Sequence, residues 1–336
     1  MKTRRIGPFK VAEIGLGCMN LSHAYGTPPE PAAAEAFLLQ ALDAGVTLFD
    51  TAALYGFGAN ETLVGRVLKA HRSRIVLCSK GGMTGQPVGA GGALQRVIDG
   101  RPAAIQRDCE DSLRRLGTDV IDLYYLHRWD KTVPIEDSVG AMARLVEQGK
   151  VRALGLSEVS AATLKRAQAV HPIAALQTEY SLWTRNPEIA VLRACAESGT
   201  AFVAFSPVGR GFLCGAPLDA AGFTPKAIRR AMPRFEPAHA AANAALLPAL
   251  AELATKAGCT PAQLALAWLL ARGGHVIPIP GTTQAAHLQE NLGAAAVTVP
   301  LAVMTTLDAQ FAPSRISGAR YNAQNESEVD TERFAA

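Results

Sequence analysis

The sequence predicts an α/β protein of the (β/α)8 TIM-barrel type. Short apolar segments alternate with amphipathic segments through most of the 336 residues, and there are eight of each kind. Segments that alternate in this way usually form parallel strands joined by helices, and strands that are apolar on both faces are buried inside the sheet. An open doubly wound sheet is the rival arrangement. Because α/β barrels of this length are routinely one domain, we expect a single domain over residues 1–336 that includes a C-terminal tail, 314–336.

The predicted strands are short runs rich in Val, Ile and Leu. In chain order they are Glu13–Leu16, Thr47–Phe49, Ile75–Ser79, Ile121–Leu126, Ala153–Leu156, Ala175–Gln177, Ala201–Phe205 and Val276–Ile279. The predicted helices between and after them are Ala32–Ala44, Glu61–Ala70, Pro102–Leu116, Ile135–Gln148, Ala161–Val170, Glu188–Ser198, Pro261–Ala271 and Gln284–Ala294. Gly45 and Gly199 stand where helices commonly stop, and Thr260 precedes a proline as a helix cap does.

Some segments do not fit the repeating unit. Arg4–Val11 is expected to form a hairpin that closes the bottom of the barrel, and Ala240–Gly258 an extra helix on the outside. Three longer stretches, Gly81–Gly100, Val208–His239 and Ser314–Ala336, are expected as loops or tail. Long loops at the catalytic end of a barrel are often substrate lids. Disorder is the alternative for the tail beyond Glu326.

Four polar side chains stand at or after the ends of predicted strands. They are Asp50, Tyr55, Lys80 and His127. Sites in parallel α/β folds gather at the carboxyl ends of the strands, so these four are expected to form one site. A carboxylate, a phenol, an ammonium and an imidazole together suit general acid catalysis on a carbonyl group.

Around these residues the chain resembles the aldo-keto reductase family. The motifs that carry the resemblance follow the family's order and are Asp50–Gly56 (DTAALYG), Ser79-Lys80, Leu126-His127, Gly155–Glu158 (GLSE), Gln177–Ser181 (QTEYS), Phe205–Pro207 (FSP) and Ile279–Thr282 (IPGT). The resemblance implies a TIM-barrel oxidoreductase that reduces aldehydes or ketones with NAD(P)H. A nucleotide-binding regulatory or redox-sensing barrel subunit with little turnover is the alternative, and a phosphate-sugar isomerase barrel without cofactor is a second rival.

Reduction of a carbonyl needs a hydride on carbon and a proton on oxygen. Tyr55 is the expected proton donor, and a neighbouring Lys80 ammonium is expected to bring the pKa of its phenol towards neutrality. Asp50 would hold Lys80 in its charged form. His127 would position the substrate oxygen by a hydrogen bond.

The cofactor is expected to bind without a Rossmann fingerprint, because Gly15–Asn20 has Asn20 where the third glycine should stand. The resemblance assigns the nicotinamide amide to Ser157, Glu158 and Gln177. Relatives commonly have Asn where Glu158 stands, and a carboxylate cannot donate, so another donor would be needed. Phe205 would stack on the nicotinamide ring. Backbone N–H groups of the following segment would wrap the pyrophosphate together with Arg210; its residues are Ser206, Pro207, Gly209, Arg210 and Gly211.

The adenosine end is expected at the start of the last predicted helix, where a helix N-terminus favours phosphate. The residues assigned there are Gly281, Thr282, Thr283, Gln284, His287, Glu290 and Asn291. Gln284 and His287 stand where relatives usually have Lys and Arg that grip the 2′-phosphate. NADP(H) is therefore expected with a modest preference, and NAD(H) is the alternative.

The substrate is expected to contact Met83, Arg128, Trp129 and Trp183, while Met19 is assigned to the cofactor and also rings the substrate. Aromatic walls favour a small or aromatic aldehyde. A basic cluster in the seventh loop is interpreted as a solvated helix face, with an acidic substrate as the alternative; it consists of Lys226, Arg229, Arg230 and Arg234.

The overall composition limits the kinds of molecule that the protein is expected to bind. A net charge of +4 without a basic run makes nucleic acid an unexpected partner. No apolar segment is long enough for a membrane span, and the first residues lack a signal core. The six cysteines are scattered without metal-ligand spacing, so no metal is expected. These features favour a cytoplasmic protein whose partner is a small carbonyl compound, and the oligomeric state stays open.

Overall fold

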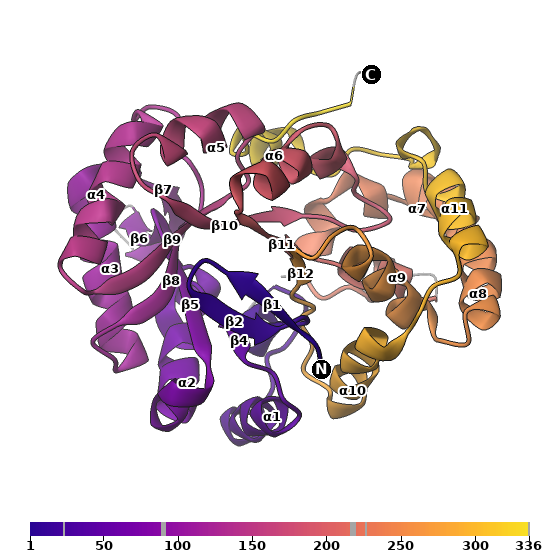
Figure 1. The fold of residues 1–336 in the computed structure, drawn as a ribbon, viewed down its shortest axis with the longest axis horizontal. Coiled ribbons are helices and arrows are strands. Elements are labelled where there is room, and N and C mark those ends of the chain that lie inside the picture. The colour runs from indigo at the N-terminus through magenta and orange to yellow at the C-terminus, as the bar shows by residue number, and fades with distance from the viewer. Residues whose placement is uncertain (23, 89–91, 216–219, 226, 335–336) are drawn as a thin grey trace.

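The computed structural model describes residues 1–22, 24–88, 92–215, 220–225 and 227–334. Eight parallel strands form one curled sheet in the order β3-β4-β5-β8-β9-β10-β11-β12 (Figure 1). The strands are β3 (Leu16–Gly17), β4 (Leu48–Asp50), β5 (Val76–Gly81), β8 (Ile121–Leu126), β9 (Val151–Ser157), β10 (Ile173–Glu179), β11 (Ala201–Phe205) and β12 (Val276–Pro278). Each strand corresponds to one predicted from the sequence, and the (β/α)8 fold is confirmed.

Backbone hydrogen bonds close the sheet into a barrel. The N–H of Gly15 donates to the carbonyl of Pro278 (3.0 Å), and that of Gly17 donates to Pro280 (3.3 Å), so the first strand meets the last. Buried side chains, mostly small or branched and apolar, fill the lumen; they include Leu48, Val76, Cys78, Leu123, Ala153, Ala175, Val203 and Ile277, together with the aromatic Tyr125. A filled lumen leaves the rims of the barrel as the places where a ligand can bind.

The predicted N-terminal hairpin is confirmed as β1 (Thr3–Ile6) paired with β2 (Phe9–Ala12). Ile6 and Val11 are fully buried and pack onto the lower end of the lumen. Gly7, in the turn, has a φ of +52°, and a Cβ there would lie 2.9 Å from the Cβ of Ala174. The hairpin therefore closes the amino-terminal end of the barrel, and the opposite end is open to ligands.

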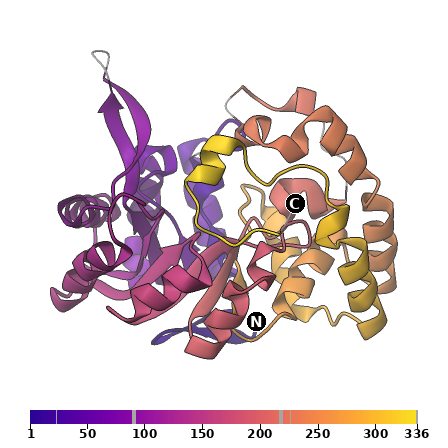
Figure 2. The same ribbon diagram turned by 90° about the horizontal axis from the view of Figure 1, so that it is seen from above.

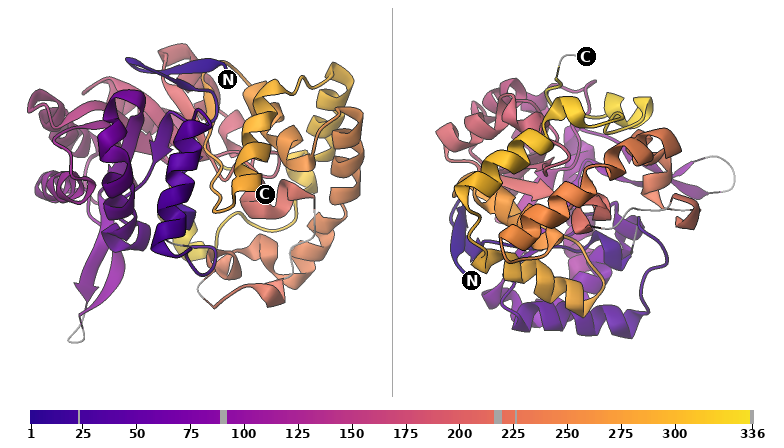
Figure 3. Two further views of the ribbon diagram at one scale, coloured as in Figure 1. Left: turned by 90° about the horizontal axis from the view of Figure 1, so that it is seen from below. Right: turned by 90° about the vertical axis from the view of Figure 1, so that its right-hand side faces the viewer.

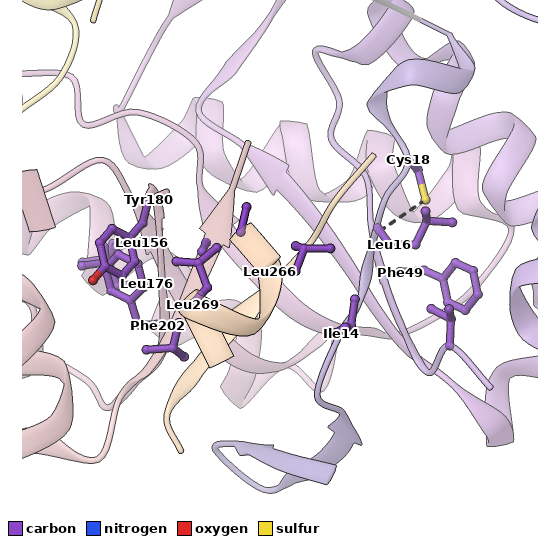
Figure 4. Close-up of a cluster of buried hydrophobic side chains, with 14 of the residues drawn as sticks. Ile14, Leu16, Cys18, Phe49, Leu156, Leu176, Tyr180, Phe202, Leu266 and Leu269 are labelled. Carbon is purple, nitrogen blue, oxygen red and sulfur yellow. Dashed lines mark hydrogen bonds between the residues drawn. The ribbon is translucent and has the colours of Figure 1, made fainter. Parts of the chain in front are cut away.

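Helices cover the outside of the barrel, and Figure 3 shows α1 and α2 side by side. The helices that alternate with the strands are α1 (Pro31–Asp43), α2 (Ala59–Leu68), α3 (Pro102–Leu116), α4 (Ile135–Glu147), α5 (Ala161–Gln168), α6 (Val191–Ser198), α9 (Pro261–Leu270) and α10 (Ala285–Gly293). Apolar residues between strands and helices form the main core. Figure 4 draws part of it, including Ile14, Leu16, Phe49, Leu156, Leu176, Tyr180, Phe202, Leu266 and Leu269. Thr260 and Gln263 cap α9 reciprocally, as the Thr-Pro signal predicts.

The segments outside the repeat are more ordered than their sequences suggest. Gly81–Gly100 contains a hairpin, β6 (Met83–Val88) and β7 (Ala93–Ile98), that projects from the barrel (Figure 2). The extra helix expected over Ala240–Gly258 is two helices, α7 (Pro237–Ala244) and α8 (Leu247–Lys256). The chain continues through α11 (Leu301–Gln310) and α12 (Ala323–Ser327). Val329 is buried, so the described part of the tail beyond 326 packs on the molecule. Within the described residues, no helix combines the length and apolarity that crossing a bilayer requires.

Candidate active site

The four predicted catalytic residues meet at the carboxyl ends of neighbouring strands. Asp50 ends β4, Lys80 lies one residue before the end of β5, and His127 directly follows β8. Tyr55 begins a 3-10 helix, Tyr55–Gly58, after β4. Because β4, β5 and β8 are adjacent in the sheet, the fold brings these side chains together.

A fully buried Lys80 connects the site. Its Nζ donates to Asp50 Oδ1 (2.5 Å), to the carbonyl of Thr51 (2.9 Å) and to Tyr55 Oη (3.3 Å). Asp50 Oδ2 accepts from Gln177 Nε2 (2.8 Å). Burial lowers the pKa of Lys80, but Asp50 and Tyr55 outweigh it, so the net pKa is raised. Lys80 therefore stays an ammonium with all three protons directed at named acceptors.

The Tyr55 phenol is kept in its protonated form. Burial raises its pKa, and the nearby Lys80 and Arg128 cations lower it less than burial raises it. The net pKa lies above the usual value, which differs from the expectation that Lys80 alone would bring it towards neutrality. A phenol in this state holds a proton that it can donate, while the ammonium stabilises the phenolate left behind.

His127 is a neutral imidazole beside Tyr55. The two ring centroids lie 5.8 Å apart with an interplanar angle of 86°. Burial, with the charges of Arg128 and Lys80, holds the pKa of His127 well below its usual value. Its Nδ1 is buried and has no hydrogen-bond partner among the described residues. The Nε2–H tautomer is therefore favoured, since a proton on Nδ1 would find no acceptor among the described residues.

A cavity of about 680 Å³ opens above these residues. Among the residues predicted for catalysis and binding, it is lined by Met19, Asp50, Tyr55, Met83, His127, Arg128, Ser157, Gln177, Phe205, Ser206, Pro207, Arg210, Gly211, Gly281, Thr282, Thr283, Gln284, His287, Glu290 and Asn291. The residues come from the ends of seven strands and from α10. Five of the predicted residues do not line it, namely Lys80, Trp129, Glu158, Trp183 and Gly209. Lys80 lies directly behind Tyr55 and Asp50.

Glu158, assigned to the nicotinamide amide, is held by the C-terminal tail. It is buried, its Oε2 accepts from Arg320 Nη2 (2.5 Å), and its Oε1 accepts from the N–H of Glu179 (2.9 Å). Its φ of +56° is unusual for a residue with a side chain. The structure thus gives Glu158 a structural ion pair, and Ser157 and Gln177 are left at the cavity wall.

Arg210, assigned to the pyrophosphate, also has its charge neutralised within the protein. Its Nη2 donates to the buried Glu179 (2.5 Å) and to the Tyr321 hydroxyl (3.4 Å), and its Nη1 donates to the Tyr25 hydroxyl (3.1 Å). The N–H groups of Gly209 and Gly211 donate to carbonyls of their own loop, and φ is positive at both. These glycines therefore serve the shape of the loop, although the segment lines the cavity as expected.

Arg229 and Arg234 of the seventh-loop cluster do not belong to a solvated helix face, whereas Arg230 is exposed as expected. Arg234 is largely buried and donates to the carbonyl of Trp183 and to Thr184 (2.8 Å). Arg229 lines the cavity, and its guanidinium lies 4.0 Å from the ring centroid of Phe223. No described carboxylate pairs with Arg229, and its Nε is buried without a partner. Lys226 lies outside the described residues.

Two residues predicted to contact the substrate, Trp129 and Trp183, pack against other parts of the protein and do not line the cavity. The Trp129 Nε1 donates to the carbonyl of Val133 (2.9 Å), and its ring packs partly buried against the main core. Trp183 is buried and stacks on Phe212 at a centroid distance of 4.2 Å. Both act as packing residues in this structure.

Sequence reasoning missed several lining residues. They come from the first loop, from the β6–β7 hairpin and from the tail: Tyr25, Arg96, Tyr321, Asn325 and Glu328. Arg96 Nη2 donates to Glu328 (2.5 Å) and to Asn325 (3.1 Å), so the hairpin and the tail meet across the cavity. The one sequence feature that could have indicated these contacts is the composition of the tail. It contains an aromatic residue, Tyr321, next to charged residues, which is unusual for a segment without contacts.

Known proteins resemble this chain over nearly its whole length. The family model described as "Aldo/keto reductase family" matches residues 13–310. The aldo-keto reductase yakc [NADP(+)] of Schizosaccharomyces pombe is 42% identical over 95% of this chain and 94% of the relative. The probable aldo-keto reductase 1 of Glycine max is 41% identical over 93% and 89%.

Solved structures agree with this assignment. The glycerol dehydrogenase of Gluconobacter oxydans superposes with a TM-score of 0.85 at 26% identity, covering 96% of this chain and 98% of that one. The holo form of an aldo-keto reductase from Bacillus halodurans gives a TM-score of 0.70 at 28% identity, covering 96% and 99%. The chain that carries this site belongs to the aldo/keto reductase family of oxidoreductases.

Proposed function

We propose that this protein reduces aldehydes or ketones to alcohols with NADPH, and that Tyr55 donates the proton. The observation that carries the proposal is the 3.3 Å contact between Lys80 Nζ and Tyr55 Oη, with Asp50 2.5 Å from the same ammonium, at the floor of a cavity. The fission yeast relative is named for NADP(+), which supports the choice of cofactor. NAD(H) stands as the alternative.

The residues present fit a dinucleotide. The cavity volume of about 680 Å³ lies within the range of cofactor sites. A Cβ on Gly281 would lie 3.0 Å from the carbonyl of Gly17 and 3.1 Å from Asn20 Oδ1, so a side chain at this point of the cavity wall would crowd the first loop. Arg229, which no described carboxylate pairs, offers a cation to a phosphate, and α10 begins at the cavity wall with Gln284 as its N-cap. NADPH, when bound, supplies the hydride.

The chain itself supplies the proton and the alignment. A carbonyl oxygen that accepts from Tyr55 Oη and from His127 Nε2–H is held by two donors at the wall of the cavity. Tyr55 gives its proton to this oxygen, and Lys80 stabilises the phenolate that forms. Asp50 and the Thr51 carbonyl fix the ammonium in place. General acid assistance of this kind contributes about 10²–10⁴-fold to the rate.

Under this proposal the protein acts on a small carbonyl compound in the cytoplasm. Among the described residues, no group of His, Cys, Asp and Glu side chains is arranged to hold a metal ion. The acid–base residues named above account for the chemistry assigned to the chain.

Substitution of Tyr55 tests the proposal. We expect Tyr55→Phe to bind NADPH with the wild-type dissociation constant and to lose about 10²–10⁴-fold in kcat for a simple aromatic aldehyde. Tyr124→Phe removes a hydroxyl outside the cavity and serves as the matched control. Wild-type kcat in Tyr55→Phe would remove the role of Tyr55. Tight NADPH binding by the wild type without turnover of aldehydes, ketones or sugars would instead favour the regulatory, redox-sensing subunit.

A further inference from the structure

Arg128 lines the cavity, and one edge of its guanidinium has no hydrogen-bond partner among the described residues. Its Nη1 donates to the carbonyl of His127 (2.7 Å) and to Ser157 Oγ (3.1 Å). Its Nε and Nη2 have no partner in the described part of the chain, and neither atom is buried. These two nitrogens lie on one side of the planar group, where they can donate in parallel to the two oxygens of one carboxylate.

Three other cations at the site have anionic partners, whereas Arg229, which lines the cavity as well, has none among the described residues. The pairs are Lys80 with Asp50, Arg96 with Glu328 and Arg210 with Glu179. Arg128 forms no ion pair with any carboxylate in the described ranges. A half-buried cation without a partner is costly in a folded protein. An anion that arrives with a ligand would compensate this charge.

Arg128 lies within electrostatic reach of the reacting groups. Its charge lowers the pKa of Tyr55 and of His127, and it is the residue next to His127 in the chain. A molecule whose carbonyl oxygen contacts Tyr55 and His127 can therefore place a second group on the open edge of Arg128.

We propose that Arg128 binds a carboxylate of the substrate, so that the protein prefers carbonyl compounds bearing an acidic group over their neutral counterparts. This inference rests on the proposed function, because it names the substrate class of the same site. It adds an acidic group to the small or aromatic aldehyde expected from the sequence. The acidic-substrate alternative is retained, but its cation is Arg128 instead of the seventh-loop cluster.

The contact between Arg128 and Ser157 offers one competing role. Ser157 is a position that the family uses for the nicotinamide amide, and Glu158 is engaged elsewhere by Arg320. An Arg128 that held the cofactor would affect every substrate equally and would weaken NADPH binding. An Arg128 that held the substrate would affect acidic substrates selectively.

The test compares aldehydes of nearly the same shape that carry either an anionic carboxylate or a neutral carboxamide. We would measure kcat/KM for 3- and 4-carboxybenzaldehyde and for the corresponding carboxamides. Wild-type protein should favour at least one acid over its amide by about tenfold or more, since hydrogen bonds to charged groups contribute about 1.5–3 kcal/mol, or about 10- to 150-fold. Both aldehydes take the same proton from Tyr55, so the ratio cancels any effect of Arg128 on that phenol.

Three variants sharpen the comparison. Arg128→Gln should lower the acid-to-amide ratio by about tenfold or more. Arg128→Lys keeps the charge but loses the planar edge, so its ratio should lie between the two. Arg193→Gln, on α6 with 80% of its side chain exposed, changes the net charge equally and should keep the wild-type ratio. Dissociation constants for NADPH, from Trp fluorescence, should stay at the wild-type value in all three.

Each other outcome overturns the inference. Turnover of neutral and acidic aldehydes without preference, or an unchanged ratio in both Arg128 variants, would refute it while leaving the proposed function intact. Weaker NADPH binding in Arg128→Gln, with equal losses on acids and amides, would assign Arg128 to the cofactor. NADPH binding without turnover of any aldehyde would refute the proposed function, and this inference with it.

Discussion

Breaking the Glu158–Arg320 ion pair should strongly destabilise the fold. Both side chains are buried, with 0% and 7% of their surfaces exposed, and Nη2 lies 2.5 Å from Oε2. Removing one partner of such a pair leaves an uncompensated charge and costs about 3–5 kcal/mol of unfolding free energy. Arg320→Gln leaves Glu158 with the N–H of Glu179 as its remaining donor in the core. Glu158→Gln should cost less, because the charge of Glu179 still acts on Arg320.

The double variant separates the pair from its surroundings. With both charges removed, no isolated ion is left, so the double substitution should cost about 2–3 kcal/mol less than the sum of the two single costs. Urea unfolding at neutral pH, followed by Trp fluorescence and checked for reversibility, measures all four free energies. The coupling should change little between low and high salt, because buried pairs are weakly screened. Additive costs, or single costs below about 1 kcal/mol, would show that burial does not make this pair structurally important.

Three further outcomes are expected. Lys80→Met should abolish most of the reductase activity and shift the pH–rate profile to higher pH, because the phenolate of Tyr55 loses the cation that stabilises it. A variant with the wild-type rate and pH profile would show that Lys80 has only a structural role. Burial raises the pKa of Asp108 to about 6 from 3.8, so the folded state binds this proton more tightly and loses stability as the pH rises through that window. Asp108→Asn should therefore raise the free energy of unfolding by up to about 3 kcal/mol at pH 7 and by little at pH 4, measured by urea titration. A lower free energy of unfolding at pH 7 would contradict this. Gln284→Lys should tighten NADPH binding and leave NADH binding unchanged, because only NADPH carries the 2′-phosphate that an added ammonium can attract. Dissociation constants for both cofactors check this, and equal gains for NADPH and NADH would show that residue 284 does not face the 2′-phosphate.

The sequence was most informative where function depends on residues close to strands. The bounds of β8 and β11 agree with the predicted ranges, because Val, Ile, Leu and aromatic runs bounded by turns have few other solutions. Asp50, Lys80 and His127 could be located because the end of a barrel strand is a defined place. Neither feature depends on knowing the distant parts of the chain.

What the sequence could not supply are contacts between distant segments. Nothing near Glu158 indicates that Arg320, 162 residues later, will neutralise it. The family motif suggested a cofactor ligand there instead. The β6–β7 hairpin was equally obscure, because Gly81–Gly100 is rich in glycine and its pairing depends on register instead of composition. Burial likewise decided the net pKa of Tyr55, and burial is a property of the assembled fold.

The ion pair between Glu158 and Arg320 also has a consequence for the order in which the molecule is made. Asp50, Tyr55, Lys80 and His127 leave the ribosome long before residue 320 is synthesised, and N-terminal segments begin to fold first. Until the segment around Arg320 arrives, Glu158 has no counter-ion, and one wall of the cavity is absent because Tyr321 contributes to it. A nascent barrel can therefore carry the whole catalytic set and still lack a stable, closed binding site. Closing contacts that span 162 residues is slow, so the step that completes the enzyme is expected among the last in its folding.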